Sequence, residues 1–288
     1  MPLITEEDKA FFTENGYIRV KNVVPKELCD RVIADLWRFL ERDPSDRANW
    51  YDLPRDYVQT VGGTEIYHQQ SMWDVRQHPD VYQAFREIHG EDELTVSIDR
   101  LNMTPPKREG DPNQTLGAHW DTDVTGLTPP VKKPSGRVQG VLYLDDTTEE
   151  QGGFWCVPDL YKDFDNWLEK NKDNLFAGAT RPGQRRPDIS GYDVKPIPGN
   201  VGDLVIWDVH LVHGNGTNYA DSPRYAMYVA MNPIGNPWKS ESLIEAWKNI
   251  TPALPSFPGD PREWEKRHNG GPATLTPLGK QLIGLEPW

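Results

Sequence analysis

The sequence predicts an α+β fold in which helices precede an antiparallel β-sandwich or barrel. Up to residue 93, apolar residues recur mainly at helical spacing, whereas from about Leu94 they alternate with a period of two. Glycine and proline contribute 24 and 26 of the 288 residues, and 11 tryptophans accompany them. Many turns and many aromatic side chains favour short strands around a lined cavity over a helical bundle.

Helical patterns occupy mainly the first third of the chain. Thr5, followed by three acidic residues, is a predicted N-cap, and Gly16 follows the end of that segment. Pro25 lies in the first turn of the next helix, and Pro79 divides the third into two pieces because proline cannot donate an interior helix hydrogen bond. The predicted helices cover about residues 5–15, 25–42, 72–89, 161–174 and 242–249.

Strand patterns dominate the middle of the chain. In the segment 137–146, Val138 and Leu142 fall on one face, while Gln139 and Tyr143 fall on the other. We expect this strand to line a cavity, with core packing as the alternative role of Tyr143. The predicted strands cover residues 16–20, 94–103, 117–123, 137–146, 152–157, 203–211 and 224–232.

We expect a single domain over residues 1–288, since no internal repeat is visible. Residues 1–93 form its mainly helical N-terminal part, and residues 94–235 form the β core. The segment 236–288 is rich in proline, tryptophan and glycine. We interpret it as a C-terminal extension that wraps around the core.

The charge balance excludes several classes of partner. Thirty-one basic and 44 acidic residues give a net charge of −13, which argues against nucleic acid and anionic membranes, since both need a basic face. No apolar run approaches the ~18 residues of a membrane-spanning helix, and the acidic start is unlike a signal peptide. Two cysteines cannot form a disulfide framework. We therefore expect a cytoplasmic protein. We also expect a monomer or a homodimer.

One histidine and one aspartate lie two positions apart in a predicted strand. His119 and Asp121 share a face of the segment 117–123, because successive strand side chains alternate, and neighbours on one face can bind one ion. The pattern alone is weak, since seven histidines and 44 acidic residues give about one such pair by chance. A pair of ordinary polar residues is the alternative interpretation.

His213 offers a second imidazole. It follows the predicted buried strand 203–211 and precedes Gly214 and Asn215. Two imidazoles and a carboxylate on one face of an ion leave open positions and suit a non-haem Fe(II) oxygenase. His210 competes for this role, and a structural histidine with ordinary hydrogen bonds is the alternative for either residue.

Arg224 opens an apolar strand eleven residues after His213. Burial of a guanidinium is costly unless it meets an anion, and its planar fork binds a carboxylate through two hydrogen bonds. If the strand 224–232 lies beside the metal strand, Arg224 faces the far end of a dicarboxylate whose other end chelates the ion. A salt bridge at the strand end is the alternative.

The order of these motifs resembles the phytanoyl-CoA dioxygenase family of Fe(II)- and 2-oxoglutarate-dependent oxygenases. The resemblance covers most of residues 5–232 and implies a double-stranded β-helix, the cupin-like jelly-roll core, with flanking helices. The motifs that carry it are Asn15-Gly16-Tyr17-Ile18, His119-x-Asp121, Gly152-Gly153-Phe154-x-Cys156-x-Pro158, Gly202-Asp203-Leu204-x-x-Trp207, His213-Gly214-Asn215 and Arg224.

This resemblance implies that His119, Asp121 and His213 bind iron and that Arg224 holds the distal carboxylate of 2-oxoglutarate. Fe(II), O2 and this cosubstrate would then oxidise a C–H bond of a small organic or natural-product substrate, with release of succinate and CO2. Hydroxylation is the default outcome, and desaturation or cyclisation requires only a different substrate pose. Asp121 argues against halogenation, because similar halogenases lack the carboxylate so that a halide can bind.

Three further residues are candidates for contact with the cosubstrate. Asn215 matches a position where similar proteins often place a hydroxyl near the distal carboxylate. Gln139 and Asn102 lie on strands that should line the cavity, with polar packing as the alternative role. A basic loop over residues 181–186 is interpreted as solvated, although an anionic substrate such as a CoA thioester could meet it.

Two other functions compete with the oxygenase. One is a different jelly-roll metal enzyme, such as a zinc hydrolase or a cupin dioxygenase that uses no 2-oxoglutarate. That function leaves Arg224 without a task. The other is a non-catalytic relative that binds a partner, against which the intact set of predicted ligands counts.

Overall fold

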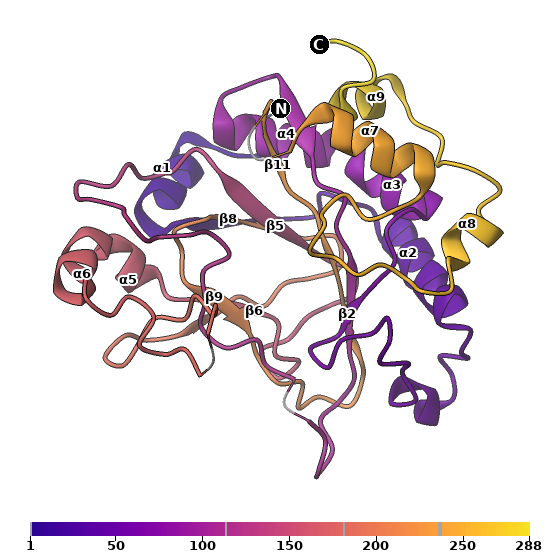
Figure 1. Ribbon diagram of the computed structural model, residues 1–288, viewed down its shortest axis with the longest axis horizontal. Coiled ribbons are helices and arrows are strands. Elements are labelled where there is room, and N and C mark those ends of the chain that lie inside the picture. Colours follow the sequence, from indigo (N-terminus) through magenta and orange to yellow (C-terminus); the bar gives the residue numbers. More distant parts are fainter. Residues whose placement is uncertain (1, 113, 181, 236–237) are drawn as a thin grey trace.

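The computed structural model of the chain describes residues 2–112, 114–180, 182–235 and 238–288. Figure 1 shows β-strands at the centre, with helices on two sides. Helices α2 (Lys26–Leu40), α3 (Gln70–Arg76) and α4 (Pro79–His89) lie on one side together with the C-terminal helices. Helices α5 (Pro158–Lys162) and α6 (Phe164–Asn171) lie on the other side.

The largest sheet has six antiparallel strands in the order β1-β8-β5-β10-β4-β2. Strand β5 lies between β8 and β10, with Gln139 opposite Trp207 and Tyr143 opposite Ala226. Both edge strands, β1 and β2, come from the mainly helical N-terminal part, so this part completes the sheet. The strands are β1 (Tyr17–Val20), β2 (Gly63–Thr64), β4 (Leu101–Thr104), β5 (Val138–Tyr143), β8 (Leu204–Asp208) and β10 (Arg224–Tyr228).

A smaller sheet of three strands, in the order β7-β6-β9, packs against the inner face of the large one. Phe154 and Cys156 from this sheet share a buried cluster with Val141, Val205 and other residues of the large sheet. Two antiparallel sheets packed face to face confirm the predicted α+β class with a jelly-roll core. The remaining strands are β6 (Phe154–Cys156), β7 (Lys195–Pro196), β9 (His213–Asn215), and the pair β3 (Leu94–Val96) and β11 (Met231–Pro233).

The outer face of the large sheet carries the main hydrophobic core. Val138 and Leu142 of β5 are buried there with Leu28, Val32 and Leu36 of α2, as the alternation along β5 and the helical spacing along α2 predict. The inner face is thereby left to line a cavity. The other helices are α1 (Glu6–Asn15), the short 3₁₀ helix Arg47–Trp50, α7 (Ser240–Asn249), α8 (Trp264–His268) and α9 (Pro277–Ile283).

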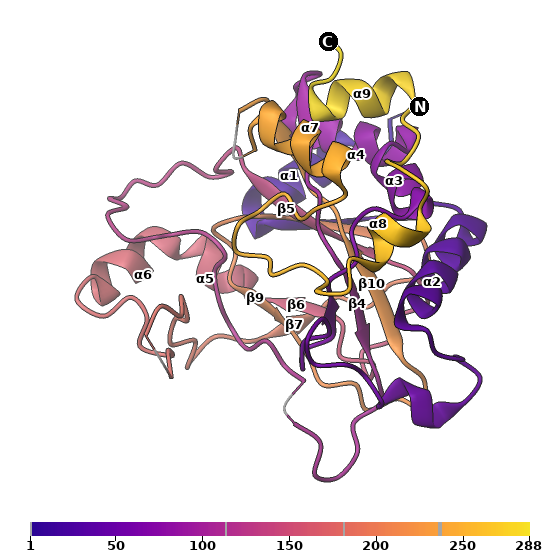
Figure 2. The same cartoon turned by 45° about the vertical axis from the view of Figure 1, so that its right-hand side comes forward.

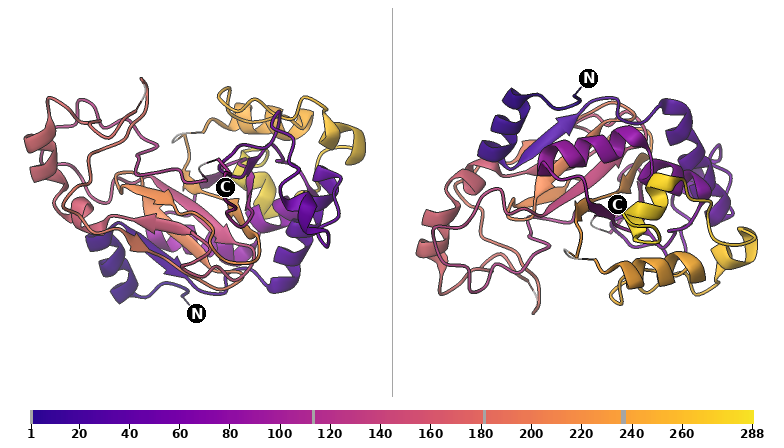
Figure 3. Two further views of the ribbon diagram at one scale, coloured as in Figure 1. Left: turned by 90° about the horizontal axis from the view of Figure 1, so that it is seen from below. Right: turned by 90° about the horizontal axis from the view of Figure 1, so that it is seen from above.

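The C-terminal segment packs on the N-terminal helical part. Figures 2 and 3 show α7, α8 and α9 gathered on the side of α2, α3 and α4. Leu243, Trp264 and Leu282 belong to the same buried cluster as α2, so the segment covers an existing core. The start of the extension predicted at residue 236 lies outside the described residues. The single-domain organisation stays a prediction.

Several predicted elements differ from the structure in their bounds. The helix predicted over 161–174 begins earlier, at Pro158, and is divided at Asp163 into α5 and α6. Pro79 divides α3 from α4, as predicted. Helices α8 and α9 were not predicted, because each is short and lies among prolines and glycines that obscure a helical pattern.

The strand predicted over residues 117–123 is wrong. Only His119 pairs here, in an isolated antiparallel bridge with His213. The next backbone N–H, that of Trp120, donates to Arg185 O over 2.9 Å, so a loop takes the hydrogen bond that a neighbouring strand would need.

The strand predicted over 94–103 is interrupted at residues 97–100, which separate β3 from β4. Hydrogen bonds that do not belong to a strand pair stabilise this interruption. Ala230 N donates to Ser97 Oγ over 2.9 Å, and Arg76 Nη2 donates to Asp99 O over 2.7 Å. The interruption places Asp99 and Arg100 at the wall of the internal cavity.

Candidate active site

Three side chains with metal-ligating atoms converge between the two sheets. Backbone hydrogen bonds of 3.0 and 3.2 Å between His119 and His213 set the two histidines side by side. The Nε2 atoms of His119 and His213 each lie 3.4 Å from a different oxygen of Asp121. One ligand atom from each residue lies within 4.8 Å of the others. This spacing suits donors that share one metal ion.

Backbone carbonyls fix the tautomer of both histidines. His119 Nδ1 lies 2.9 Å from Gly117 O, and His213 Nδ1 lies 3.0 Å from Leu211 O. Because a carbonyl oxygen only accepts, Nδ1 carries the proton and the Nε2 lone pair of each ring faces Asp121. Two lone pairs beside a carboxylate need a cation between them, and a metal ion satisfies all three donors.

The protonation preferences differ among the three groups, since burial and the nearby His119 lower the pKa of His213. Burial tends to lower the pKa of His119, but the hydrogen bond and charge of Asp121 outweigh burial and raise it. Burial tends to raise the pKa of Asp121, yet hydrogen bonds to both histidines hold that pKa well below its usual value. The carboxylate therefore stays ionised and available as a ligand.

Gln139 holds the carboxylate in place from β5. Its Nε2 donates to Asp121 Oδ2 over 2.8 Å, and its Oε1 accepts from Trp207 Nε1 over 3.1 Å. Because the indole N–H only donates, it orients the amide so that the NH2 group faces Asp121. As a contact of 2-oxoglutarate, Gln139 stays a prediction.

Arg224 is a buried cation without an acidic partner among the described residues. It is 4% exposed and donates from Nη1 to Gly152 O (2.6 Å) and from Nη2 to Asn102 Oδ1 (3.0 Å) and Thr104 Oγ1 (2.9 Å). Its Nε has no hydrogen-bond partner in the described part of the chain. Burial lowers the pKa of Arg224. A buried guanidinium held only by neutral acceptors lacks the counter-charge that an anionic ligand would supply.

The Gly152-Gly153 motif has a geometric reason. Gly152 adopts a left-handed conformation, with φ of 62°, and a Cβ atom there would lie 2.2 Å from Thr217 O. Glycine alone avoids both penalties. Its carbonyl is the one that accepts from Arg224 Nη1, so the motif aims the guanidinium.

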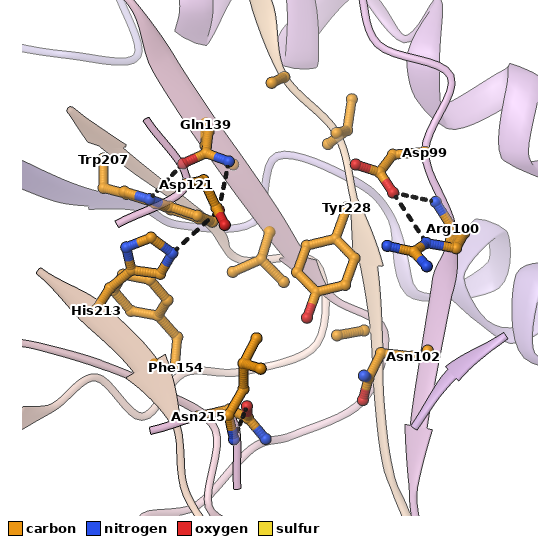
Figure 4. Close-up of a pocket in the computed structure, with 18 of the residues that line it drawn as sticks. Asp99, Arg100, Asn102, Asp121, Gln139, Phe154, Trp207, His213, Asn215 and Tyr228 are labelled. Carbon is orange, nitrogen blue, oxygen red and sulfur yellow. Dashed lines mark hydrogen bonds and ion pairs between the residues drawn. The ribbon is translucent and has the colours of Figure 1, made fainter. Parts of the chain in front are cut away.

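His119, Asp121 and His213, which we call the metal cluster because they could hold one ion, line one cavity of about 200 Å³ together with Arg224. Figure 4 shows Asp121, Gln139, Trp207 and His213 on one side of it. Asp99 and Arg100 lie on the other side of Tyr228. Further lining residues include Asn102, Tyr143, Phe154, Asn215, Ala226 and Trp238.

Two predicted cosubstrate contacts are engaged with protein groups. Asn215 Oδ1 accepts from Leu116 N over 3.0 Å, and its Nδ2 donates to Gln114 O over 3.2 Å, so this amide secures the loop before His119. Asn102 Nδ2 donates to Val61 O over 2.9 Å while Oδ1 accepts from Arg224. Both line the cavity, and their contact with 2-oxoglutarate stays a prediction.

Among the described residues, His210 lies outside the metal cluster. Its ring stacks on Phe164 with centroids 5.3 Å apart, and its Nδ1 lies 3.7 Å from Asp208 Oδ1. The geometry therefore favours His213 as the second imidazole. In the basic loop, Arg181 lies outside the described residues, and Arg185 Nη1 donates to Asp121 O over 3.0 Å.

Several cavity residues were not predicted from the sequence, among them Tyr228, Asp99 and Arg100. Tyr228 shares a strand face with Arg224, four residues earlier, so strand parity could have indicated it. No sequence pattern could have indicated Asp99 and Arg100, because they enter the cavity only where the expected strand is interrupted.

A jelly-roll core that brings two histidines and one carboxylate together is the arrangement of non-haem iron oxygenases. The family comparison agrees with this class. A family model described as phytanoyl-CoA dioxygenase (PhyH) matches residues 12–226, and the chain belongs to this family.

The individual proteins described next share 28% sequence identity or less with this chain. The chain is 28% identical over 245 residues to the Ava biosynthesis cluster protein O of Aspergillus versicolor, covering 77% of this chain and 76% of that protein. The structure resembles the hypothetical protein JW0805 from Escherichia coli with a TM-score of 0.75 at 18% identity, over 98% and 82% of the two chains. It also resembles the epimerase SnoN in complex with Fe3+, alpha ketoglutarate and nogalamycin RO, with a TM-score of 0.57 at 16% identity, over 94% and 95%. These structural likenesses establish the fold.

Among the described residues, none of the helices has both the length and the apolar character that crossing a membrane requires.

Proposed function

We propose that the protein is an Fe(II)- and 2-oxoglutarate-dependent oxygenase that acts on a small organic or natural-product substrate. Membership of the phytanoyl-CoA dioxygenase family supports this function, as does the similarity to SnoN, whose structure contains Fe3+ and alpha ketoglutarate. Hydroxylation is the proposed default reaction, with desaturation or cyclisation as alternatives that the same site permits.

The observation that carries the proposal is the pairing of two incomplete sites in one cavity. His119, Asp121 and His213 converge on the position of one ion, and Arg224 is buried nearby without a counter-charge from the described residues. A ligand with a metal-chelating end and a distal carboxylate completes both sites at once. 2-Oxoglutarate has this chemistry.

Each residue then has a stated task. His119, Asp121 and His213 hold iron, and Arg224 neutralises the distal carboxylate of 2-oxoglutarate. Bound Fe(II) supplies the centre at which O2 oxidises a substrate C–H bond while 2-oxoglutarate is converted to succinate and CO2. The protein orients the reactants and excludes competing reactions.

Aromatic side chains enclose the metal cluster. The ring of Phe154 stacks on His213 with centroids 5.7 Å apart, and Trp207 lies 4.9 Å from the same imidazole. Both rings are buried and line the cavity. They restrict water around the ligands and strengthen the electrostatic attraction of Arg224 for an anion in the cavity.

The competing functions explain less of the geometry. A zinc hydrolase or a cupin dioxygenase without 2-oxoglutarate uses the three ligands but leaves Arg224 without a ligand. A non-catalytic partner-binding relative needs neither the metal-ready histidine tautomers nor the buried guanidinium. The cytoplasmic location, the oligomeric state and the absence of nucleic-acid or membrane partners stay predictions from the sequence.

Anaerobic binding of Fe(II) and then 2-oxoglutarate tests the proposal, followed by succinate release with O2 and a panel of candidate substrates. We expect one iron per chain, 2-oxoglutarate binding that depends on Arg224, and succinate formation stimulated by one class of compound. Iron binding without 2-oxoglutarate binding contradicts the proposal and favours another jelly-roll metal enzyme.

A further inference from the structure

The cavity wall beyond Tyr228 presents a carboxylate that the mechanism above does not use. Figure 4 shows Asp99 and Asp121 on opposite sides of the Tyr228 ring, with one Asp99 oxygen bonded to Arg100 and the other free of dashed contacts. Asp99 and Arg100 both line the cavity.

The described charges at this wall do not balance. Three carboxylates, those of Glu65, Asp99 and Glu265, gather around two guanidiniums, those of Arg76 and Arg100. One negative charge is therefore left without a cation. The metal cluster does not supply one, because its own positive charge is shared by Asp121 and the proposed cosubstrate.

Of these three carboxylates, Asp99 has the fewest hydrogen-bond partners among the described residues. Glu65 is 1% exposed and lies 3.1 Å from Arg100 Nη1, closer than Asp99 Oδ1, which lies 3.6 Å from Arg100 Nε. Glu65 also accepts from Tyr67 Oη and Gly259 N. Arg100 is thus shared by Glu65 and Asp99 and supplies one positive charge to two carboxylates.

The other buried carboxylate is also satisfied. Glu265 accepts hydrogen bonds from Tyr67 N (2.9 Å), His68 N (2.6 Å) and Gln69 Nε2 (2.9 Å). The Asp99 carboxylate receives one hydrogen bond from the described residues, from Arg100 N to Oδ1 over 2.7 Å. Its side chain is 30% exposed, and its nearest described cation, Arg100 Nε, lies 3.6 Å from Oδ1.

We propose that Asp99 binds a protonated amine of the substrate, which defines the substrate as an organic cation. This inference rests on the proposed oxygenase function, because it names the substrate class of that site. The ammonium group would complete the charge balance of the wall. Tyr228 and Trp238, which also line the cavity, offer ring faces that attract a cation.

An anionic substrate fits this cavity less well. Two arginines line the cavity among the described residues; Arg224 is assigned to 2-oxoglutarate, and Arg100 pairs with Glu65 and Asp99. Arg185 and Arg186 of the basic loop lie outside the described cavity lining. The net charge of −13 also favours the approach of cations over anions.

Three probes of similar size and different charge test the inference: 2-phenylethylamine, 3-phenylpropionate and 2-phenylethanol. Binding is measured by anaerobic calorimetry to the protein loaded with Fe(II) and 2-oxoglutarate, and again to the metal-free protein. We expect the amine to bind about tenfold more tightly than the alcohol and the carboxylate. Asp99→Asn should remove this preference, whereas Asp99→Glu should keep most of it.

The control is Asp193→Asn, which removes the same charge from an exposed side chain and should bind the probes as the wild type does. Melting temperatures verify that each variant folds. The inference is overturned if the amine binds no tighter than the alcohol, if it does not bind, or if Asp99→Asn retains the preference. Failure of Fe(II) or 2-oxoglutarate to bind the wild type overturns the oxygenase proposal instead, and the metal-free titrations still decide the role of Asp99.

Discussion

Gln139 Nε2 donates a hydrogen bond to Asp121 Oδ2 over 2.8 Å, from the strand β5 to the loop that carries the first two predicted iron ligands. Asp121 is the most exposed member of the metal cluster, with a side chain 47% accessible. A mobile carboxylate would be a poor ligand, so the amide acts as its brace.

We predict that Gln139→Ala weakens iron binding about tenfold to a hundredfold, because loss of a group that orients a metal ligand has effects of this size. Competitive metal titration measures the affinity. Trp207→Phe removes the N–H that orients the amide, together with part of the ring that packs near His213, but keeps Gln139 itself, so it should weaken iron binding less than Gln139→Ala does. Unchanged iron affinity in Gln139→Ala would contradict the role of the brace.

Arg224→Met should raise the dissociation constant of 2-oxoglutarate by about 30-fold or more, since loss of one partner of a buried charge pair costs roughly 2–5 kcal/mol. The dissociation constant of Arg224→Lys should fall between those of Arg224→Met and the wild type, because lysine keeps the positive charge but lacks the planar guanidinium that forms two hydrogen bonds. Bound iron, measured in the same samples, should remain. Tight 2-oxoglutarate binding by Arg224→Met would contradict the assignment.

Glu265→Ala should destabilise the fold by about 3 kcal/mol, because it leaves three buried donors in the segment 67–69 without their acceptor. Urea unfolding measures the free-energy change. Glu241→Ala, at an exposed position in the first turn of α7, is the matched control and should cost well under ~1 kcal/mol. Equal effects of the two substitutions would show that the C-terminal segment is not held through Glu265.

His68 predicts a pH dependence of stability. Its Nε2 lies 2.8 Å from Thr251 O, and Trp73 Nε1 donates to Nδ1 over 3.4 Å, so the buried ring is neutral with the proton on Nε2. Burial lowers its pKa to about 3. In the unfolded chain the pKa of His68 is about 6.5. As the pH falls below this value, His68 binds a proton in the unfolded chain but stays neutral in the folded one, so the free energy of unfolding decreases.

This residue should therefore contribute a loss of about 1 kcal/mol of unfolding free energy between pH 7 and pH 5.5. His68→Gln should reduce the measured loss by that amount, although it lowers stability at both pH values. Urea unfolding of both proteins at the two pH values provides the comparison. An identical pH dependence in His68→Gln would contradict a neutral, buried His68.

The sequence predicts the fold well where a local pattern carries the information. The alternation in 137–146 correctly separates Val138 and Leu142, in the outer core, from Gln139 and Tyr143, in the cavity wall. The pattern in 94–103 does not reveal the interruption, since Ser97 and Asp99 are held by Ala230 and Arg76, which are distant in sequence. Such contacts exist only after the chain has folded.

The metal cluster shows both the strength and the weakness of motif-based inference. His119 and Asp121 do meet His213, but the strand parity used to align them has no basis, because residues 117–123 form no strand. A single bridge to His213 sets the geometry instead. The order of the motifs indicated the cluster, and the local conformation had to come from the structure.

Glu65 joins the wall that carries Asp99 to the end of the chain, since it pairs with Arg100 and accepts from Gly259 N, while Phe257 packs on the Arg100 guanidinium at 3.9 Å. The proposed iron ligands come from an earlier, separate stretch. If both proposals hold, the proposed substrate contact and the proposed iron ligands depend on different parts of the polypeptide. Substitutions at Phe257 or Gly259 would then alter the surroundings of Asp99 without touching the proposed iron ligands.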